Sequence, residues 1–280
     1  MRRTPLHLAA SRRRRTPGLV LFLAVIACRT GRNYPASQEP RFAGDRLDTA
    51  SIVASRPDTL RLASFNIEFS LQVDSAIAVL ASSLVLRGAD VLLLQEMNEK
   101  ATARIAAALG LGYVYYPAIF HFRTRQNVGN AVLSRWPIVE DKKLVLPHVS
   151  RFVRTQRTAT AATIRAGGSL VRVYSTHLGT MGDLAPAARR EQLRAILADA
   201  EQYPRVVIGG DMNDASVGQT ARAEGYVWPT EHGPPTTRLG RLDHIFLKGF
   251  AVPDSAAAGT VLNVGSASDH LPVWALAILP

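Results

Sequence analysis

Eight polar side chains that are widely separated in the sequence share one setting: each lies at the end of an apolar segment. They are Asn66, Glu96, His177, Asp211, Asn213, Asp243, Asp269 and His270. Taken singly, each has a local interpretation, such as a turn former or an acid at the start of a helix. In a sheet, however, the ends of neighbouring strands hold their side chains close together on a rigid scaffold. We therefore expect folding to bring these groups into one site.

The donor types in this set indicate a hard metal ion. Carboxylate and amide oxygens without a thiolate suit Mg²⁺ or Mn²⁺, and the chain lacks the HExxH and CxxC spacings of common zinc sites. It also lacks a P-loop and a Gly-x-Ser-x-Gly elbow, so nucleotide-driven phosphoryl transfer and serine hydrolysis find no support. A carboxylate-held divalent ion with two histidines is what phosphoester hydrolysis requires, because the ion offsets charge on the phosphoryl oxygens while acids and bases move protons.

The elements that must position these groups alternate between strand and helix from residue 59 to the end. Apolar runs of strand length are expected at 60–67, 89–97, 127–138, 142–149, 157–166, 169–178, 204–214, 241–247 and 271–279. Helical spacing is expected at 74–88, 98–110 and 185–202, the first two ending at glycine. Nothing interrupts this alternation, so residues 59–280 are predicted to form one domain.

The N-terminal residues have a different composition. A basic segment with six arginines and no acid precedes the apolar run GLVLFLAVIAC, residues 18–28, which is shorter than the roughly 20 residues that span a membrane. This layout is typical of a secretory signal, and residues 25–28 resemble a bacterial lipoprotein signal. We therefore expect a lipoprotein-type signal at 1–27, lipidation of Cys28 and a flexible tether at 28–58. The alternative is a plain signal peptide with an incidental cysteine.

Charge and cysteine content constrain the part that would remain. The formal net charge is +11, and setting aside the six arginines of the first 15 residues leaves +5. This mild excess suits an anionic substrate or surface without predicting nucleic-acid binding. Cys28 is the only cysteine, so the domain must fold without disulfides, which its length allows.

The ordered motifs SFNIE, LLQEM, GNAVLSRWPI, STHL, GGDMND, RLDHIFL and SDHLPV resemble the endonuclease/exonuclease/phosphatase family. Each motif is weak alone, whereas GGDMND followed by DHIF and a terminal SDHLP is specific. The resemblance covers roughly residues 59–280. It implies an α/β (α+β) fold, a four-layer sandwich with two mixed β-sheets face to face and helices outside, and a hydrolase that depends on Mg²⁺ or Mn²⁺.

The resemblance also implies residue roles. Glu96 is the principal metal ligand, with Asn66 beside it and Asp269 completing the shell. Asp243 fixes the tautomer of His270, whose other nitrogen addresses water or a phosphoryl oxygen. The remaining assignments are leaving-group assistance by His177, nucleophile orientation by Asp211 and Asn213, and phosphate contacts by Asn130 and Arg157, the last of which has a solvated strand position as its alternative.

The residues leave the substrate open. A signal of either kind implies export, so we expect a periplasmic or cell-surface lipoprotein, or a secreted protein, that acts as a monomer. Aromatic and basic residues at 113–127 could contact a nucleic acid or a phospholipid head group, which leaves a secreted nuclease and a sphingomyelinase-like phosphodiesterase as alternatives. Repair of abasic DNA is disfavoured because that substrate is intracellular. A non-catalytic phosphate-binding module is disfavoured because none of the expected catalytic groups is lost.

Overall fold

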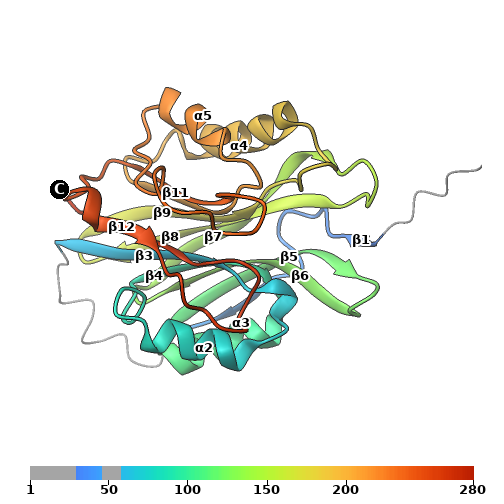
Figure 1. Ribbon diagram of the computed structural model, residues 1–280, viewed down its shortest axis with the longest axis horizontal. Helices are drawn as coiled ribbons and strands as arrows, with labels where there is room; N and C mark the ends of the chain where they lie inside the picture. Colours follow the sequence, from blue (N-terminus) through green and yellow to red (C-terminus); the bar gives the residue numbers. More distant parts are fainter. Residues whose placement is uncertain (1–29, 46–57) are drawn as a thin grey trace, which may run out of the picture.

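Two β-sheets pack face to face, and helices cover the outer side of each (Figure 1). The computed structural model describes residues 30–45 and 58–280. The expected four-layer sandwich of two mixed sheets is confirmed. The predicted signal, with Cys28, lies outside the described residues. Among the described residues, no helix combines the length and apolar character that a bilayer crossing needs.

The first sheet carries Asn66 and Glu96 at the ends of two parallel strands. Its strands are β1 (Gly31–Asn33), β2 (Phe42–Gly44), β3 (Thr59–Asn66), β4 (Val91–Met97), β5 (Gly112–His121), β6 (Gln126–Ser134), β12 (Ala258–Thr260) and β13 (Val273–Ile278). Their order is β1-β5-β6-β4-β3-β13-β12, and β2 also pairs with β5. Because β3 and β4 run parallel, their carboxyl ends lie at the same edge of the sheet.

The second sheet aligns three of the predicted site residues in one row. Its strands are β7 (Ile138–Val149), β8 (Gln156–Ala166), β9 (Ser169–His177), β10 (Val206–Asp211) and β11 (Asp243–Lys248), in the order β11-β10-β9-β8-β7. Parallel pairing places Asp211 beside His177, and antiparallel pairing places Asp243 on the other side of Asp211. Strand register therefore brings these three residues together before any side chain is considered.

Helices cover the two outer faces of the sandwich. They are α2 (Val73–Ser82), α3 (Glu99–Leu109), α4 (Pro186–Ala200) and α5 (Val217–Ala223), with 3₁₀ turns η1 (Glu68–Ser70) and η2 (Ser255–Ala257). In α3, the side chain of Asn98 accepts a hydrogen bond from the Ala101 amide, and Gly110 ends the helix in the left-handed region. The first predicted helix ends at Ser82 rather than at Gly88, because Ser83 adopts an extended conformation.

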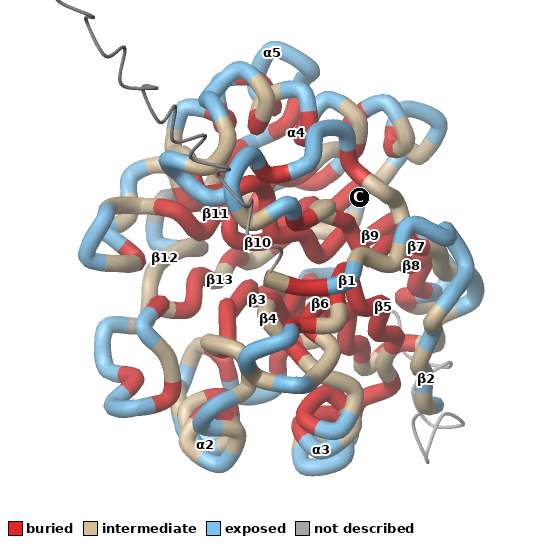
Figure 2. The backbone as a smooth tube through the Cα atoms, turned by 90° about the vertical axis from the view of Figure 1, so that its right-hand side faces the viewer, coloured by how far each residue is buried: buried red, intermediate tan, exposed pale blue. Residues whose placement is uncertain are grey.

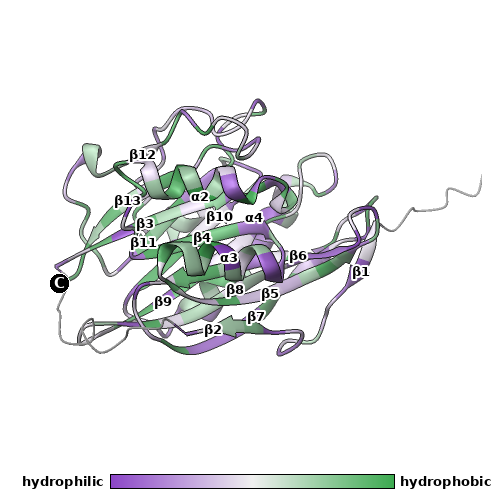
Figure 3. Cartoon of the chain, turned by 90° about the horizontal axis from the view of Figure 1, so that it is seen from below, coloured by the Kyte–Doolittle hydropathy of each residue, from purple (hydrophilic) through white to green (hydrophobic). Residues whose placement is uncertain are grey.

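Apolar side chains fill all three spaces between the four layers. Between the sheets, Leu93 and Val132 pack in one cluster with Val173 and Val207. A second cluster lies between the first sheet and α2 with α3, and a third between the second sheet and α4 with α5. Figure 2 shows the strands mostly buried and many connecting loops exposed, and Figure 3 shows hydrophobic colouring along much of the central strands. Burial of this surface is the main favourable term in folding.

A polar bridge joins the two sheets beneath the strand ends. Gln95 of β4 donates a hydrogen bond from Nε2 to Ser175 Oγ of β9, at 3.0 Å, and Ser175 Oγ donates to the carbonyl of Leu94, at 3.0 Å. Buried polar groups that satisfy one another fix relative positions more strictly than apolar packing does. The bridge therefore sets how the strand ends of one sheet face those of the other.

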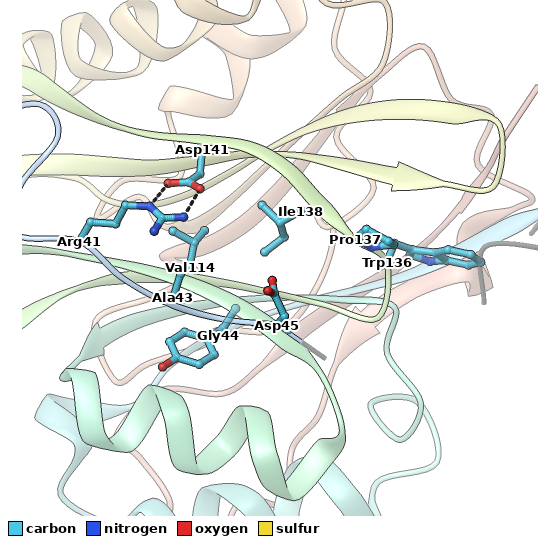
Figure 4. A pocket seen from close by; sticks show the side chains of 11 residues that line it. Arg41, Ala43, Gly44, Asp45, Val114, Trp136, Pro137, Ile138 and Asp141 are labelled. Atoms are coloured by element: carbon cyan, nitrogen blue, oxygen red, sulfur yellow. Dashed lines mark hydrogen bonds and ion pairs between the residues drawn. The ribbon is translucent and has the colours of Figure 1, made fainter. Parts of the chain in front are cut away.

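Residues 30–45, here called the N-terminal strap, differ from the flexible tether predicted over 28–58. Within the strap, β1 and β2 both pair with β5. Arg41 donates two hydrogen bonds of 2.7 Å to the carboxylate of Asp141 in β7 (Figure 4). The buried Lys143 Nζ donates to the carbonyls of Tyr34 and Glu39, at 2.9 and 2.6 Å. Three residues are too few for a periodic pattern of apolar residues. These two strands therefore could not be predicted from the sequence and are recognised only by their pairing with β5.

Candidate active site

One cleft of about 760 Å³ opens at the end of the sandwich where β3, β4, β9 and β10 finish and β11 and β13 begin. Its lining includes six of the predicted site residues: Glu96, His177, Asp211, Asn213, Asp269 and His270. Asn66 and Asp243 lie directly behind this lining and bond to it. The predicted convergence of these eight residues is therefore confirmed.

His270 forms a dyad with Asp243. The Nδ1 atom of His270 lies 2.8 Å from Asp243 Oδ2, and its Nε2 lies 3.7 Å from Asp211 Oδ2. Burial alone would lower the pKa of His270, but the hydrogen bond to Asp243 and its charge raise that pKa to about 9. At neutral pH the ring therefore carries a proton on each nitrogen, with Nε2–H directed toward Asp211 and the cleft.

His177 has the opposite electrostatic environment. Its Nε2 lies 3.2 Å from Asp211 Oδ2, and its Nδ1 lies 3.7 Å from Glu96 Oε1. Burial lowers the pKa of His177 well below its usual range, and the positive charges of Arg157 and His270 lower it further. The two histidines of the site thus differ in protonation at neutral pH: His177 is neutral and His270 is charged.

Asp211 is the side chain to which the others connect. Its Oδ2 accepts a hydrogen bond from Asn66 Nδ2 at 3.2 Å, and its Oδ1 accepts one from the amide of Asn213 at 3.0 Å. Asn213 has a positive φ of 52° and donates its own Nδ2 to the carbonyl of Leu178. Burial raises the pKa of Asp211 above its usual range, and the adjacent charge of Asp243 acts in the same direction.

Glu96 reaches the cleft because β4 is irregular at this point. The pairing of β4 with β6 shifts register between Leu94 and Met97, and Glu96 has a positive φ of 56°, the signature of a β-bulge that redirects a side chain. The amide of Phe69 donates to Glu96 Oε2 at 3.0 Å. Burial raises the pKa of Glu96, partly offset by the charge of Arg157.

The acidic groups fit a divalent cation. Glu96, Asp211 and Asp243 are all largely removed from water, and Asp243 Oδ1 is buried with no hydrogen-bond partner among the described residues. Buried carboxylates are costly unless cations or donors compensate them, and oxygen donors suit a hard ion. Ligand atoms of Asp211, Asp243 and His270 lie within 4.8 Å of one another. The predicted ligands Glu96 and Asp269 line the same cleft, and Asn66 lies directly behind it.

The two predicted phosphate contacts lie outside this cleft. Asn130 donates from Nδ2 to the carbonyl of Thr158 at 2.8 Å, and Arg157 donates to Thr180 Oγ1 at 2.7 Å. Both border a separate cavity of about 30 Å³ that shares only Glu96 and His177 with the main cleft. Arg157 therefore acts on the site through its charge, which opposes the raised pKa of Glu96.

Two hydroxyl side chains that support the dyad were not predicted. Ser268 Oγ donates to the carbonyl of Asn66 at 2.6 Å and accepts the amide of His270 at 3.1 Å. Thr236 Oγ1 accepts the amide of Asp243 at 3.2 Å. A serine two residues before the histidine is a local turn signal, which could have identified Ser268. The contact of Thr236 depends on tertiary structure and has no local signal.

Two exposed leucines in the lining of the cleft were also not predicted. Leu239 and Leu262 line the cleft together with Arg238, and their exposed fractions are 76% and 68%. The cleft therefore offers apolar surface as well as acidic groups.

Comparisons with known proteins agree with this geometry. Residues 63–270 match the sequence profile of the endonuclease/exonuclease/phosphatase family. No curated protein matches the chain. Among solved structures, a protein of that description from Beutenbergia cavernae is 20% identical with a TM-score of 0.64, covering 80% of this chain and 72% of its own.

Two further structures are similar to a comparable degree. D. rerio TDP2 complexed with a single-strand DNA product is 18% identical with a TM-score of 0.63, covering 79% of this chain and 99% of its own. The human nocturnin catalytic domain with bound sulfate is 17% identical with a TM-score of 0.60, covering 86% and 98%. At these identities, the structural similarity establishes the fold alone.

Proposed function

Because this chain belongs to the endonuclease/exonuclease/phosphatase family, whose members are metal-dependent hydrolases of phosphoester bonds, we propose that it hydrolyses a phosphodiester or phosphomonoester by attack of water. The observation that carries the proposal is the convergence of Glu96, His177, Asp211 and the Asp243–His270 dyad on one cleft. That group contains both a charged imidazole and a carboxylate of raised pKa, which are an acid and a base in reach of each other.

We assign the water-activating role to Asp211, because its raised pKa suits a group that accepts a proton near neutral pH. Asn66 and His177 both contact Asp211 Oδ2 and hold the carboxylate in place. The Nε2–H group of His270 stabilises negative charge on the phosphoryl group or protonates the leaving oxygen, with Asp243 fixing the ring.

Glu96 is the proposed main ligand of the divalent ion, with Asn66 and Asp269 beside it. When bound, Mg²⁺ or Mn²⁺ would offset the charge that develops on the phosphoryl oxygens. Support comes from the donor chemistry, since these side chains offer oxygens and the described residues contain no thiol. Asp243 Oδ1, which is buried without a hydrogen-bond partner among the described residues, is a second sign that the site can accept a further positive charge.

We further propose that the enzyme acts outside the cytoplasm as a monomeric lipoprotein anchored through Cys28, or as a secreted enzyme if Cys28 is incidental. The basic segment and apolar run of residues 1–28 support export. An external nucleic acid, a phospholipid head group and a small phosphoester are all compatible with export. The exposed side chains of Leu239 and Leu262 in the cleft lining favour an ester with an apolar substituent.

Hydrolysis of bis-p-nitrophenyl phosphate with Mg²⁺, with Mn²⁺ and with EDTA tests the reaction class. We expect turnover with a divalent ion and none in EDTA. A panel of supercoiled DNA, RNA, sphingomyelin, phosphatidylinositol phosphates and inositol phosphates, each with divalent ion, then identifies the ester. No metal-dependent turnover on any of them would overturn the proposal and favour a non-catalytic phosphate-binding module.

A further inference from the structure

The N-terminal strap begins between two surface turns of the domain. The amide of Thr30 donates to the carbonyl of Val153 at 3.3 Å, in the turn between β7 and β8. The carbonyl of Thr30 accepts the amide of Phe122 at 2.9 Å, in the turn between β5 and β6. Figure 1 shows β1 between these two turns at one end of the sandwich. The chain therefore enters the domain at a fixed point on its surface.

Aromatic rings and guanidinium groups surround that point. Phe122 and Phe152 are exposed by 51% and 58%, although large aromatic rings are usually buried. Four exposed arginines flank them: Arg123, Arg125, Arg151 and Arg154. We call these six residues the exit face. The guanidinium of Arg151 lies over the Phe152 ring, 5.3 Å from its centroid. Asp183 is the nearby acid, and it accepts the amide of Phe152.

The exit face lies next to the apolar run in the sequence. Cys28 ends that run and stands two residues before Thr30, so at most about 7 Å of extended chain separates them. If the run or a lipid on Cys28 enters a bilayer, the short connection places the exit face at the lipid surface. A long flexible tether would not have imposed this proximity.

We propose that the exit face docks the domain onto an anionic lipid surface. Arginines near anionic head groups each contribute about 1 kcal/mol, and aromatic side chains favour the depth of the membrane interface. Neither contribution depends on catalysis, so the proposal goes beyond the phosphoesterase activity and rests only on the N-terminal membrane attachment proposed above. The position of the chain entry favours a lipid surface over a nucleic acid, although the same arginines could contact phosphates of either.

Docking in this way would place the cleft beside the membrane. On one side, Phe69 lies between the exit face and the site. Its ring packs against His121, the residue before Phe122, with 5.3 Å between ring centroids, and its amide donates to Glu96. From the other side, Thr180 lines the cleft and precedes Asp183, the partner of the Phe152 amide. The exit face and the cleft therefore border the same end of the molecule.

Quenching of tryptophan by lipids with brominated acyl chains tests the proposal in the full chain. Phe122→Trp and Phe152→Trp are reconstituted in vesicles of phosphatidylcholine, with or without phosphatidylglycerol. Leu84→Trp is the control, because Leu84 is 79% exposed near Arg87, whose carbonyl bonds Arg61 at the opposite end of β3. We expect the two exit-face tryptophans to lose emission when phosphatidylglycerol is present, and the control to keep it. Equal quenching at all three positions, or at none, would overturn the proposal.

Charge reversal separates docking from catalysis. Arg151→Glu with Arg154→Glu, in the Phe152→Trp background, should abolish the quenching that depends on phosphatidylglycerol. Turnover of soluble bis-p-nitrophenyl phosphate should not change, because neither arginine borders the cleft. Binding of a single-stranded oligonucleotide is measured in parallel. If the reversal removes oligonucleotide binding, and the vesicles never quench the Phe152→Trp protein, the face recognises nucleic acid and the lipid proposal is wrong.

Discussion

Asp211 and Asp243 lie opposite each other in the β10–β11 pair, and both face the ring of His270. Two adjacent buried carboxylates repel each other, and the imidazolium between them reduces that repulsion. The same contacts hold the ring with one nitrogen on each acid. The electrostatic asymmetry of the site, with a charged His270 and a neutral His177, follows from this arrangement.

Removing the dyad should slow turnover without removing the metal. We expect His270→Ala to lower kcat by about 10²–10⁴-fold, because it removes a group that acts in the transition state. Isothermal titration with Mn²⁺ should show nearly unchanged affinity. His232→Ala is the matched control, since His232 is a highly exposed histidine outside the cleft. Wild-type turnover in His270→Ala would contradict the assignment.

Glu96→Gln should weaken metal binding and activity together. The substitution keeps the shape of the side chain but removes the charge that a divalent ion requires. We expect the metal concentration for half-maximal turnover of bis-p-nitrophenyl phosphate to rise, with partial recovery of rate at high Mn²⁺. Glu99→Gln, in the first turn of α3, is the control. An unchanged metal requirement in Glu96→Gln would exclude it as the main ligand.

The stability that His270 contributes should disappear as the pH rises. Its folded pKa of about 9 exceeds the unfolded value of about 6.5, so the contribution is complete below pH 6.5 and is lost as pH rises through 9. Urea unfolding in EDTA between pH 6.5 and 9.5 gives the difference in the free energy of unfolding between wild type and His270→Gln. We expect this difference to shrink with increasing pH. A constant difference would mean that the dyad does not hold the proton.

Gly210→Ala should damage both folding and activity. Gly210 has a φ of 152°, and a Cβ there would lie 1.8 Å from the carbonyl oxygen of Thr176 on β9. The two strands would have to separate, which we expect to cost about 1–3 kcal/mol or more and to displace Asp211 from His177. Gly225→Ala is the control, because Gly225 also has a positive φ but its Cβ would meet no atom of residues 30–45 or 58–280 within 4 Å. Chemical denaturation should show the larger loss for Gly210→Ala.

Lys143→Ala should release the N-terminal strap. The variant leaves the carbonyls of Tyr34 and Glu39 without their shared donor, at a cost of about 2 kcal/mol. Cleavage by trypsin after Arg41, followed by mass spectrometry, should therefore become faster. Lys100→Ala, an exposed position on α3, should not change it. Cleavage at the wild-type rate in Lys143→Ala would show that other contacts hold the strap.

The sandwich was predicted from the resemblance of the ordered motifs to a known family, and the convergence of the site from the polar groups that end long apolar strands. Glu96, Asp211 and His270 could be identified from such strand ends. The orientation of Glu96 could not be predicted, since it depends on a bulge that appears only in the pairing of β4 with β6. Asn130 and Arg157 occupy suitable strands, but neither lines the cleft. Asn130 donates to the carbonyl of Thr158, and Arg157 donates to the hydroxyl of Thr180, which is a lining residue.

Short elements were the least predictable part of the fold. The strands β1, β2 and β12 have three residues each, too few for a period to appear, and they form because β5 and β13 offer partners. The helix α5 contains a glycine in its first turn, which weakens its local signal. These elements depend on tertiary contacts, and local patterns carry little information about them.

The pairing of the strap with β5 has a practical consequence for expression of the catalytic body. Residues Gly31–Asn33 and Phe42–Gly44 pair with the free edge of β5 over most of its length. A truncated protein that starts at Thr59 would expose that border as a row of unpaired amides and carbonyls, which invites strand-to-strand aggregation between molecules. Truncated proteins intended to stay dispersed at high concentration should therefore begin no later than Thr30.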